Sequence, residues 1–436
     1  MNTNKDLYCL IGDPVSHSLS PAIQNGAFRL AGMKAVYIPV KVRKEELGRY
    51  VKILRELDVR GMNVTMPHKI EVMRHIDRLD DTAEKIGSVN TIVNERGNLR
   101  GYNTDVTGAV EAIRELIPDL KGKRAAILGR GGMARAVSYG LEEEGAETKM
   151  LGRNEMRAES ISRELEDADI ICNCTPIGMN GEPSPVPSSL LGAEKLVVDA
   201  AYSFHKTELI RMAERKGCRT VTGIRILVNQ GANSFRLWTR LNPDRDAMMA
   251  AAHSRISEMK KRRRWNIYLI GSAGSGKTSA GRHLSEFLNR KFVDTDELIA
   301  RESGRSVRDI IEGQGEFEFR NMERSVIERL SRKQGYVVAT GGGVVLSYDN
   351  IYRMKESGMV FLLDASPETV YERLKGDSSH PLLNGKRGRI DYQKVVRLYS
   401  LRKNYYDISK DYEVSTNGKG VEMVAAEIGG KVGDLD

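Results

Sequence analysis

The sequence has few cysteines, few prolines and no long apolar run. Its 436 residues include four cysteines and 12 prolines, and no stretch approaches the roughly 18 apolar residues that span a bilayer. Four cysteines in a chain of this length cannot form a disulfide framework, and the first residues lack the basic and apolar segments of a secretion signal. We therefore expect a cytoplasmic protein with no membrane partner.

A basic stripe is also missing, although the net charge is +9. Residues 1–259 carry 37 basic and 34 acidic side chains, and most of the excess lies in five consecutive basic residues, 260–264. Such a run can bind nucleic acid, but binding to the phosphate backbone needs cations spread over a domain face. We interpret the run as a solvated connector between two nearly neutral parts and expect no nucleic-acid partner.

The strongest motif is GSAGSGKT at residues 271–278, a phosphate-binding P-loop. It follows an apolar strand and precedes a helical stretch, which is the context that this motif requires. Its glycines let backbone N–H groups turn toward phosphate oxygens. We expect Lys277 to reach the β and γ phosphates and Thr278 to be a ligand of Mg²⁺. The expected ATP-binding residues are Gly271, Gly274, Ser275, Gly276, Lys277, Thr278 and Ser279.

A second glycine-rich loop predicts a dinucleotide site. It lies between a strand and a helix, and the next strand ends about twenty residues further on; its residues are Gly129, Gly131, Gly132, Met133 and Ala134. Enzymes that use NAD usually have an acid at that strand end, whereas this chain has Arg153 and Arg157 there. Two guanidinium groups favour the 2′-phosphate of NADP, although Glu155 could instead hold an unphosphorylated ribose.

These motifs belong to two longer sets. Residues 1–259 resemble shikimate dehydrogenase through GDPVSHSLSPAIQN, NVTMPHK, GSVNT, GYNTD, GRGGMARA, CTPIGM and LVNQGANSFRLWT. Residues 265–436 resemble shikimate kinase through GSAGSGKT, FVDTD, GEFEFRNME, TGGG, HPLL and RKNYY. The resemblance implies one chain that reduces 3-dehydroshikimate to shikimate with NADPH and then phosphorylates shikimate to shikimate 3-phosphate with ATP and Mg²⁺.

The alternation of strands and helices predicts an α/β protein with parallel sheets covered by helices. With the resemblance, we expect a shikimate dehydrogenase-like substrate domain at 1–105, completed by helices at about 233–257. A Rossmann NADP-binding domain is expected at 106–232, a basic linker at 258–264, and a P-loop kinase domain at 265–436.

In the dehydrogenase half, the resemblance makes Lys69 and Asp105 the catalytic pair. The pairing is chemically reasonable, because a carboxylate orients an ammonium group that must exchange a proton with the substrate oxygen. The resemblance also implies substrate-binding residues Ser16, Ser18, Thr65, Asn90, Asp105, Tyr202 and Gln230, and further NADP-binding residues Thr175 and Gly223. Two positions depart from the family pattern, Phe204 and Ile226, and we expect the second to change the shape of the nicotinamide pocket.

In the kinase half, the resemblance gives Asp294 a part in holding Mg²⁺, and Asp296 a part in binding the ring hydroxyls and accepting the attacking proton. Arg320 and Arg402 would clamp the substrate carboxylate, a bidentate task that suits guanidinium, with Glu323 orienting Arg320. Other expected contacts are Gly341, Gly342 and Gly343 to the substrate and Arg373 to adenine.

One departure leaves an alternative open in the kinase half. The family closes an arginine over the phosphates, and this chain has His380 at that position. Either nearby cations replace the arginine or His380 acts itself; the candidates are Lys375, Lys386, Arg387 and Arg389. The competing hypothesis is a quinate/shikimate dehydrogenase fused to a kinase-like nucleotide-binding module that regulates it.

Overall fold

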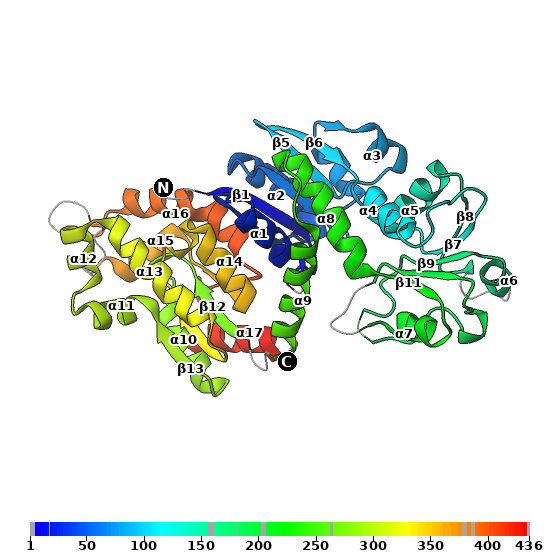
Figure 1. Ribbon diagram of the computed structural model, residues 1–436. Coiled ribbons are helices and arrows are strands. Elements are labelled where there is room, and N and C mark those ends of the chain that lie inside the picture. The colour runs from blue at the N-terminus through cyan, green and yellow to red at the C-terminus, as the bar shows by residue number, and fades with distance from the viewer. Residues whose placement is uncertain are drawn as a thin grey trace. The chain divides into compact units, whose positions relative to one another are not determined.

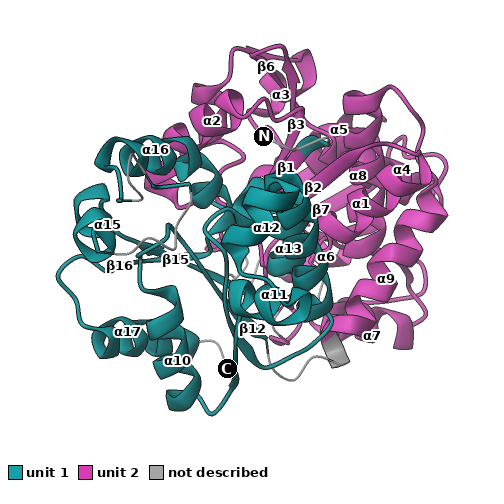
Figure 2. Cartoon of the chain, turned by 90° about the vertical axis from the view of Figure 1, so that its left-hand side faces the viewer, with its two compact units in different colours: residues 1–7, 38–41, 262–436 teal, residues 8–37, 42–261 magenta. Residues whose placement is uncertain are grey.

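The computed structural model describes residues 5–16, 18–155, 161–179, 181–201, 206–261, 265–376, 382–384 and 389–433. The chain divides into two compact units, a larger one of residues 8–37 and 42–261 and a smaller one of 1–7, 38–41 and 262–436 (Figure 2). Several residues singled out above lie outside the described residues, namely Arg157, Tyr202, Phe204, His380, Lys386 and Arg387.

The first sheet has six strands in the order β2-β1-β3-β5-β6-β4. These are β1 (Asp6–Gly12), β2 (Ala35–Lys41), β3 (Gly61–Val64), β4 (Arg78–Leu79), β5 (Thr91–Glu95) and β6 (Asn98–Tyr102). Helices α1 (Ser20–Leu30), α2 (Leu47–Glu56) and α3 (Asp81–Ile86) and the short 3-10 helices η1 (Lys44–Glu46) and η2 (Glu71–His75) connect them.

This sheet is mixed, so the expectation of parallel sheets is wrong here. Strand β1 pairs with β3 in parallel, but β5 is antiparallel to both β3 and β6. The reason is local: Arg96 and Gly97 form a two-residue turn with φ of 56° and 92°. Positive φ at both central residues is typical of the turn that joins adjacent antiparallel strands.

The second sheet is fully parallel, in the order β11-β10-β9-β7-β8. Its strands are β7 (Arg124–Leu128), β8 (Glu147–Leu151), β9 (Ile170–Asn173), β10 (Leu196–Asp199) and β11 (Arg219–Thr222), and its helices are α5 (Gly132–Glu143), α6 (Ile161–Glu166), η4 (Ser188–Leu190) and α7 (Glu208–Arg215). Successive residues of β7 alternate between two buried clusters, with Ile127 in one and Leu128 in the other. This pattern places a hydrophobic core on each face of the sheet.

Helix α4 (Asp105–Arg114) connects β6 to β7, and helices α8 (Gly223–Thr239) and α9 (Arg245–Lys261) follow β11. Helices α4 and α8 pack closely (Figure 1), and Gly108 permits it, because a Cβ there would lie 2.7 Å from the backbone N of Gln230. Helix α9 continues to Lys261, so the expected linker at 258–264 begins inside a helix. The segment Ser-Glu-Met-Lys-Lys contains no glycine or proline that would end it.

The third sheet belongs to the smaller unit and is parallel, in the order β13-β14-β12-β15-β16. Its strands are β12 (Asn266–Ile270), β13 (Lys291–Asp294), β14 (Tyr336–Ala339), β15 (Gly358–Asp364) and β16 (Tyr412–Ser415). Its helices are α10 (Lys277–Phe287), α11 (Thr295–Ser303), α12 (Val307–Gln314), α13 (Glu316–Ser331), η5 (Val344–Leu346), α14 (Tyr348–Ser357), α15 (Pro367–Leu374), α16 (Tyr392–Ser409) and α17 (Val421–Gly433). None of the helices in the described part of the chain has the length and apolar character that a membrane crossing requires.

Candidate active sites

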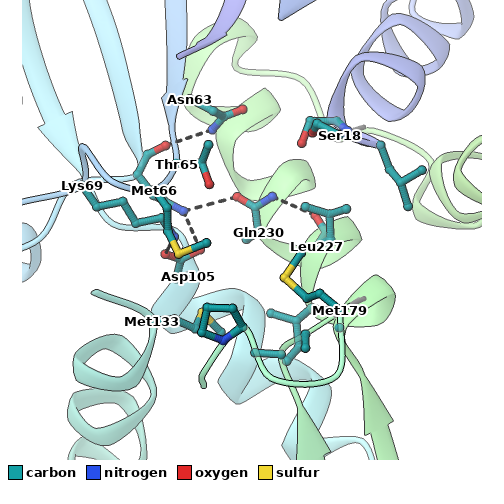
Figure 3. A pocket seen from close by; sticks show the side chains of 18 of the residues that line it. Ser18, Asn63, Thr65, Met66, Lys69, Asp105, Met133, Met179, Leu227 and Gln230 are labelled. Atoms are coloured by element: carbon teal, nitrogen blue, oxygen red, sulfur yellow. Dashed lines mark hydrogen bonds and ion pairs between the residues drawn. The ribbon is translucent and has the colours of Figure 1, made fainter. Parts of the chain in front are cut away.

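A cavity of about 370 Å³ opens in the larger unit, and its lining comes from both of that unit's sheets. Lys69 and Asp105 meet in it, with Lys69 Nζ donating to Asp105 Oδ2 at 2.6 Å (Figure 3). Lys69 lies in the turn that follows β3, and Asp105 is the first residue of α4. Their side chains are 18% and 6% exposed, so solvent screens this pair little and the ammonium is held in one place.

The other carboxylate oxygen of Asp105 also accepts a hydrogen bond. Asn90 Nδ2 donates to Asp105 Oδ1 at 2.8 Å, to Thr104 Oγ1 at 3.0 Å and to Gln230 Oε1 at 3.3 Å. Gln230 Nε2 in turn donates to the carbonyl oxygen of Leu227 at 2.9 Å. The structure therefore brings together four residues expected from the sequence, and this buried network fixes the orientation of the Asp105 carboxylate.

The residues expected to bind substrate differ in whether they line the cavity. Thr65 and Ser18 line the cavity with Lys69, and Figure 3 shows Ser18 across the pocket from Lys69. Ser18 Oγ also accepts the backbone N–H of Ser20 at 3.2 Å, so this side chain supports the start of α1 as well. Ser16, in the turn before α1, is exposed and is not among the residues that line the cavity, and its part in substrate binding stays a prediction.

The sequence interpretation missed Asn63. Its side chain lines the cavity and is buried, and its Nδ2 donates to Thr91 Oγ1 at 3.1 Å and to Ser234 Oγ at 3.0 Å. The signal that could have identified it is the two-residue period of a strand. Because alternate side chains point to the same face, Asn63 shares a face with Thr65.

The loop after β7 has the geometry of a dinucleotide site. Gly129 has a φ of 114° and approaches the carbonyl oxygen of Cys174, since a Cβ there would lie 3.2 Å from it. Gly131 precedes the first turn of α5, where backbone N–H groups are free to bind phosphate. Met133, Thr175 and Gly223 line the cavity that contains Lys69. This loop accordingly fits a nucleotide whose reactive end enters the cavity.

Charged residues surround the end of β8. Arg153 follows that strand directly after Gly152 and is exposed. Glu155, the residue that could hold an unphosphorylated ribose, forms an ion pair with Arg130 of the glycine-rich loop. The sequence interpretation did not single out Arg130.

In the smaller unit, the P-loop follows β12. Gly271, Gly274 and Gly276 have φ values of 143°, 73° and 89°, which only glycine adopts readily. Lys277 Nζ donates to the carbonyl oxygens of Gly271 at 2.9 Å and Ser272 at 2.6 Å, and burial lowers the pKa of Lys277 to about 8. The ammonium thus lies folded over the loop at the place where phosphate oxygens would bind.

Thr278 and Asp294, the two residues expected to hold Mg²⁺, lie within hydrogen-bond distance of each other. Thr278 Oγ1 donates to Asp294 Oδ2 at 2.6 Å, while Asp294 Oδ1 accepts the backbone N–H of Asp296 at 2.9 Å. No group of three or more His, Cys, Asp or Glu side chains that could hold a metal occurs among the described residues. A hydroxyl and a carboxylate are nevertheless ligands suited to Mg²⁺, which completes its shell with water and substrate phosphates.

Three glycines after β14 make room for the side chains that are expected to bind the substrate. A Cβ at Gly341 would lie 2.6 Å from Glu323 Oε1 and 2.8 Å from Asp296 Oδ1. A Cβ at Gly343 would overlap the guanidinium of Arg320, and one at Gly342 would lie 3.3 Å from Arg402 Nη1. The carboxylates and guanidinium groups therefore converge on this loop, and any side chain in place of these glycines would displace them.

Two polar atoms of this cluster are buried and have no hydrogen-bond partner within the described residues: Asp296 Oδ1 and Arg402 Nε. Buried polar groups are normally paired, so a ligand is expected to complete them. Burial, followed by the charge of Asp294, raises the pKa of Asp296 to about 6. Burial also raises the pKa of Glu323 to about 7, although Glu323 accepts two hydrogen bonds from Arg320 Nη1 at 3.1 and 3.0 Å.

Three further residues expected in the kinase half, Arg373, Lys375 and Arg389, are all exposed. Arg373 is exposed and donates to the carbonyl oxygens of Gly274 at 3.1 Å and Thr416 at 2.7 Å, which places it beside the P-loop. Of the two described lid candidates, Lys375 forms an ion pair with Glu372, and Arg389 is exposed.

Comparisons with known proteins find two families along the chain. The family model for the shikimate dehydrogenase substrate binding domain matches residues 10–92, and that for the shikimate 5'-dehydrogenase C-terminal domain matches 223–253. The shikimate kinase model matches 273–432. A shikimate dehydrogenase (NADP(+)) from Thermococcus kodakarensis is 42% identical over 266 residues, which covers 58% of this chain and 97% of that protein.

Solved structures of shikimate dehydrogenases also resemble this chain. A shikimate 5-dehydrogenase from Thermus thermophilus, in complex with NADP(H) and shikimate, superimposes with a TM-score of 0.53 at 36% identity. The match covers 57% of this chain and 99% of that one. A shikimate dehydrogenase in complex with NADP+ gives a TM-score of 0.55 at 35% identity and covers 59% of this chain and 97% of the other.

Proposed function

Because the chain belongs to the shikimate dehydrogenase family and carries a shikimate kinase domain after it, we propose how each half performs its reaction. The protein is a bifunctional enzyme of the shikimate pathway. The first site reduces 3-dehydroshikimate to shikimate with NADPH, and the second transfers a phosphoryl group from Mg·ATP to shikimate. The observation that carries this is the Lys69–Asp105 pair, 2.6 Å apart, in a cavity that the glycine-rich nucleotide loop adjoins.

In the reduction, NADPH supplies the hydride and Lys69 supplies the proton. The ammonium of Lys69 faces the cavity while its other side is held by Asp105, so the proton is aimed at the oxygen of the substrate ketone. Thr65, Ser18 and Gln230 bind the substrate around it. The pocket lining is otherwise rich in apolar side chains, which exclude water from the reacting atoms.

In the phosphoryl transfer, Asp296 accepts the proton of the attacking ring hydroxyl. Arg320, oriented by Glu323, and Arg402 hold the substrate carboxylate, for which the unpartnered Nε of Arg402 supplies a donor. Lys277 binds the β and γ phosphates, and Thr278 with Asp294 holds Mg²⁺. Because the phosphoryl group itself needs little covalent chemistry, positioning and charge carry most of the rate.

The kinase reaction is expected to have a bell-shaped pH dependence. Asp296 must be ionised to accept a proton, and its pKa is raised to about 6; Lys277 must be charged, and its pKa is lowered to about 8. The ratio kcat/KM, which reports groups of the free enzyme, should therefore fall below about pH 6 and above about pH 8. A coupled ADP-release assay over this range and about one pH unit beyond each end measures it, and a flat profile would contradict the roles given to both groups.

The cofactor choice is expected to depend on Arg153. A charge-assisted hydrogen bond to the 2′-phosphate contributes about 1.5–3 kcal/mol, so Arg153→Ala should weaken NADPH by about tenfold or more and barely affect NADH. Steady-state KM values for both cofactors test this. Equal weakening of both would contradict a phosphate-binding role for Arg153.

A further inference from the structure

An ion pair that the sequence analysis did not predict lies at the end of β8. Arg130, from the glycine-rich loop, donates through Nη2 to Glu155 Oε1, and the two side chains are 61% and 43% exposed. Ion pairs this exposed contribute little to stability, because solvent screens the charges and two long side chains must be ordered. The pair therefore contributes little to folding, and any role it has must follow from its position at the end of β8.

The Arg130–Glu155 pair lies against Gly152, at the strand end where the ribose of a dinucleotide is expected. A Cβ at Gly152 would be 2.8 Å from Glu155 Oε2 and 3.0 Å from Arg130 Nε. Gly152 directly follows β8, at the strand end where NAD-dependent enzymes carry the acid that binds the adenosine ribose. In this chain the space of that acidic side chain is taken by the Arg130–Glu155 pair.

The backbone holds Arg130 in this position. The N–H of Gly129 donates to the carbonyl oxygen of Leu151 at 2.8 Å, which ties the base of the glycine-rich loop to the last residue of β8. Gly131, on the other side of Arg130, precedes the first turn of α5. The backbone of Arg130 is therefore held between the N-terminus of α5 and the end of β8, where a dinucleotide places its pyrophosphate and its ribose.

We propose that Arg130 binds the 2′-phosphate of NADPH together with Arg153, and that Glu155 is its counter-ion in the free enzyme. This inference rests on the proposed use of NADPH. A phosphate forms short, charge-assisted hydrogen bonds with guanidinium, whereas the carboxylate of Glu155 repels it unless a cation lies between them. Arg130 thus favours NADPH, and Glu155 favours the unphosphorylated ribose of NADH.

The test is a titration of NADPH and NADH fluorescence against the full-length protein. Arg130→Ala is expected to raise the Kd for NADPH at least about tenfold, the factor that one charge-assisted hydrogen bond supplies, and that for NADH less than about threefold. Glu155→Gln is expected to shift the ratio of the two affinities toward NADPH. The melting temperatures of both variants should equal that of the wild type, because the pair is exposed.

The double variant separates direct binding from screening. Arg130→Ala/Glu155→Gln should regain part of the lost NADPH affinity, because the repulsion is gone while the phosphate still lacks one guanidinium. Complete recovery would mean that Arg130 only screens Glu155, and no recovery would mean that Glu155 has no effect; either result overturns the proposal.

A matched control is Arg114→Ala, since Arg114 is 52% exposed and pairs with Glu144 at 3.2 Å elsewhere in the same unit. It should change neither affinity. If the wild type binds NADH as tightly as NADPH, the proposed use of NADPH itself fails. If the wild type prefers NADPH but Arg130→Ala weakens both cofactors equally, or neither, only this inference fails.

Discussion

Replacing Lys69 by alanine is expected to lower kcat of the dehydrogenase by about 10²–10⁴-fold, the usual contribution of a positioned acid or base. The loss should appear mainly in kcat, because Thr65, Ser18 and Gln230, the residues proposed to bind the substrate, remain in the cavity. Phosphorylation of shikimate by the same preparation should be unchanged, since Lys69 does not belong to the compact unit that carries the P-loop. Oxidation of NADPH with 3-dehydroshikimate and release of ADP with shikimate measure the two activities separately.

Lys52→Ala is the control for this variant, because Lys52 is an exposed lysine on α2 of the same unit. It should leave both activities at the wild-type level. A parallel fall in kinase turnover on Lys69→Ala, with the fold intact by circular dichroism, would show that the halves do not work independently.

Lys277→Ala is expected to lower the turnover of the kinase and to leave the dehydrogenase unchanged. Removing a preorganised charge from a transition state typically costs about 10²–10³-fold in kcat, and Lys277 is the P-loop cation that we propose binds the phosphates. Dehydrogenase kcat and KM should remain those of the wild type. The same two assays measure this, with shikimate and Mg·ATP at saturating concentrations.

Lys291→Ala serves as the matched control, since Lys291 is exposed at the start of β13 in the same unit. Retention of more than about a tenth of kinase turnover in Lys277→Ala would contradict the role given to Lys277, because a lost transition-state charge costs more than that. Kinase activity that is missing from the wild type while Mg·ATP still binds would instead support the regulatory-module hypothesis.

The sequence predicted those features that depend on local spacing. The P-loop at 271–278 is recognisable because the positions of its glycines, lysine and threonine are set by the phosphates that they surround. The pairing of Lys69 with Asp105, 36 residues apart, could not be obtained from spacing and came from the family resemblance. The antiparallel hairpin at Arg96 and Gly97 was not predicted, because Arg-Gly is not one of the Asn-Gly, Asp-Gly or Gly-Gly pairs that typically mark such a turn.

Features that depend on tertiary packing could not be predicted. The Arg130–Glu155 pair forms because a hydrogen bond from Gly129 to Leu151 brings two separate loops together. The buried and unpartnered Nε of Arg402 depends on how α16 packs against the glycine loop at 341–343. Helix α9 runs into the basic segment because charged residues with high helix propensity form helices as readily as connectors.

The most direct test of the whole account is a single incubation of 3-dehydroshikimate with NADPH, ATP and Mg²⁺, analysed by mass spectrometry. The wild-type protein should form shikimate 3-phosphate with equal amounts of NADP⁺ and ADP. Lys277→Ala should stop at shikimate, and Lys69→Ala should leave 3-dehydroshikimate while still phosphorylating added shikimate. Accumulation of unphosphorylated shikimate by the wild type, with ATP unconsumed, would contradict a chain that catalyses both steps.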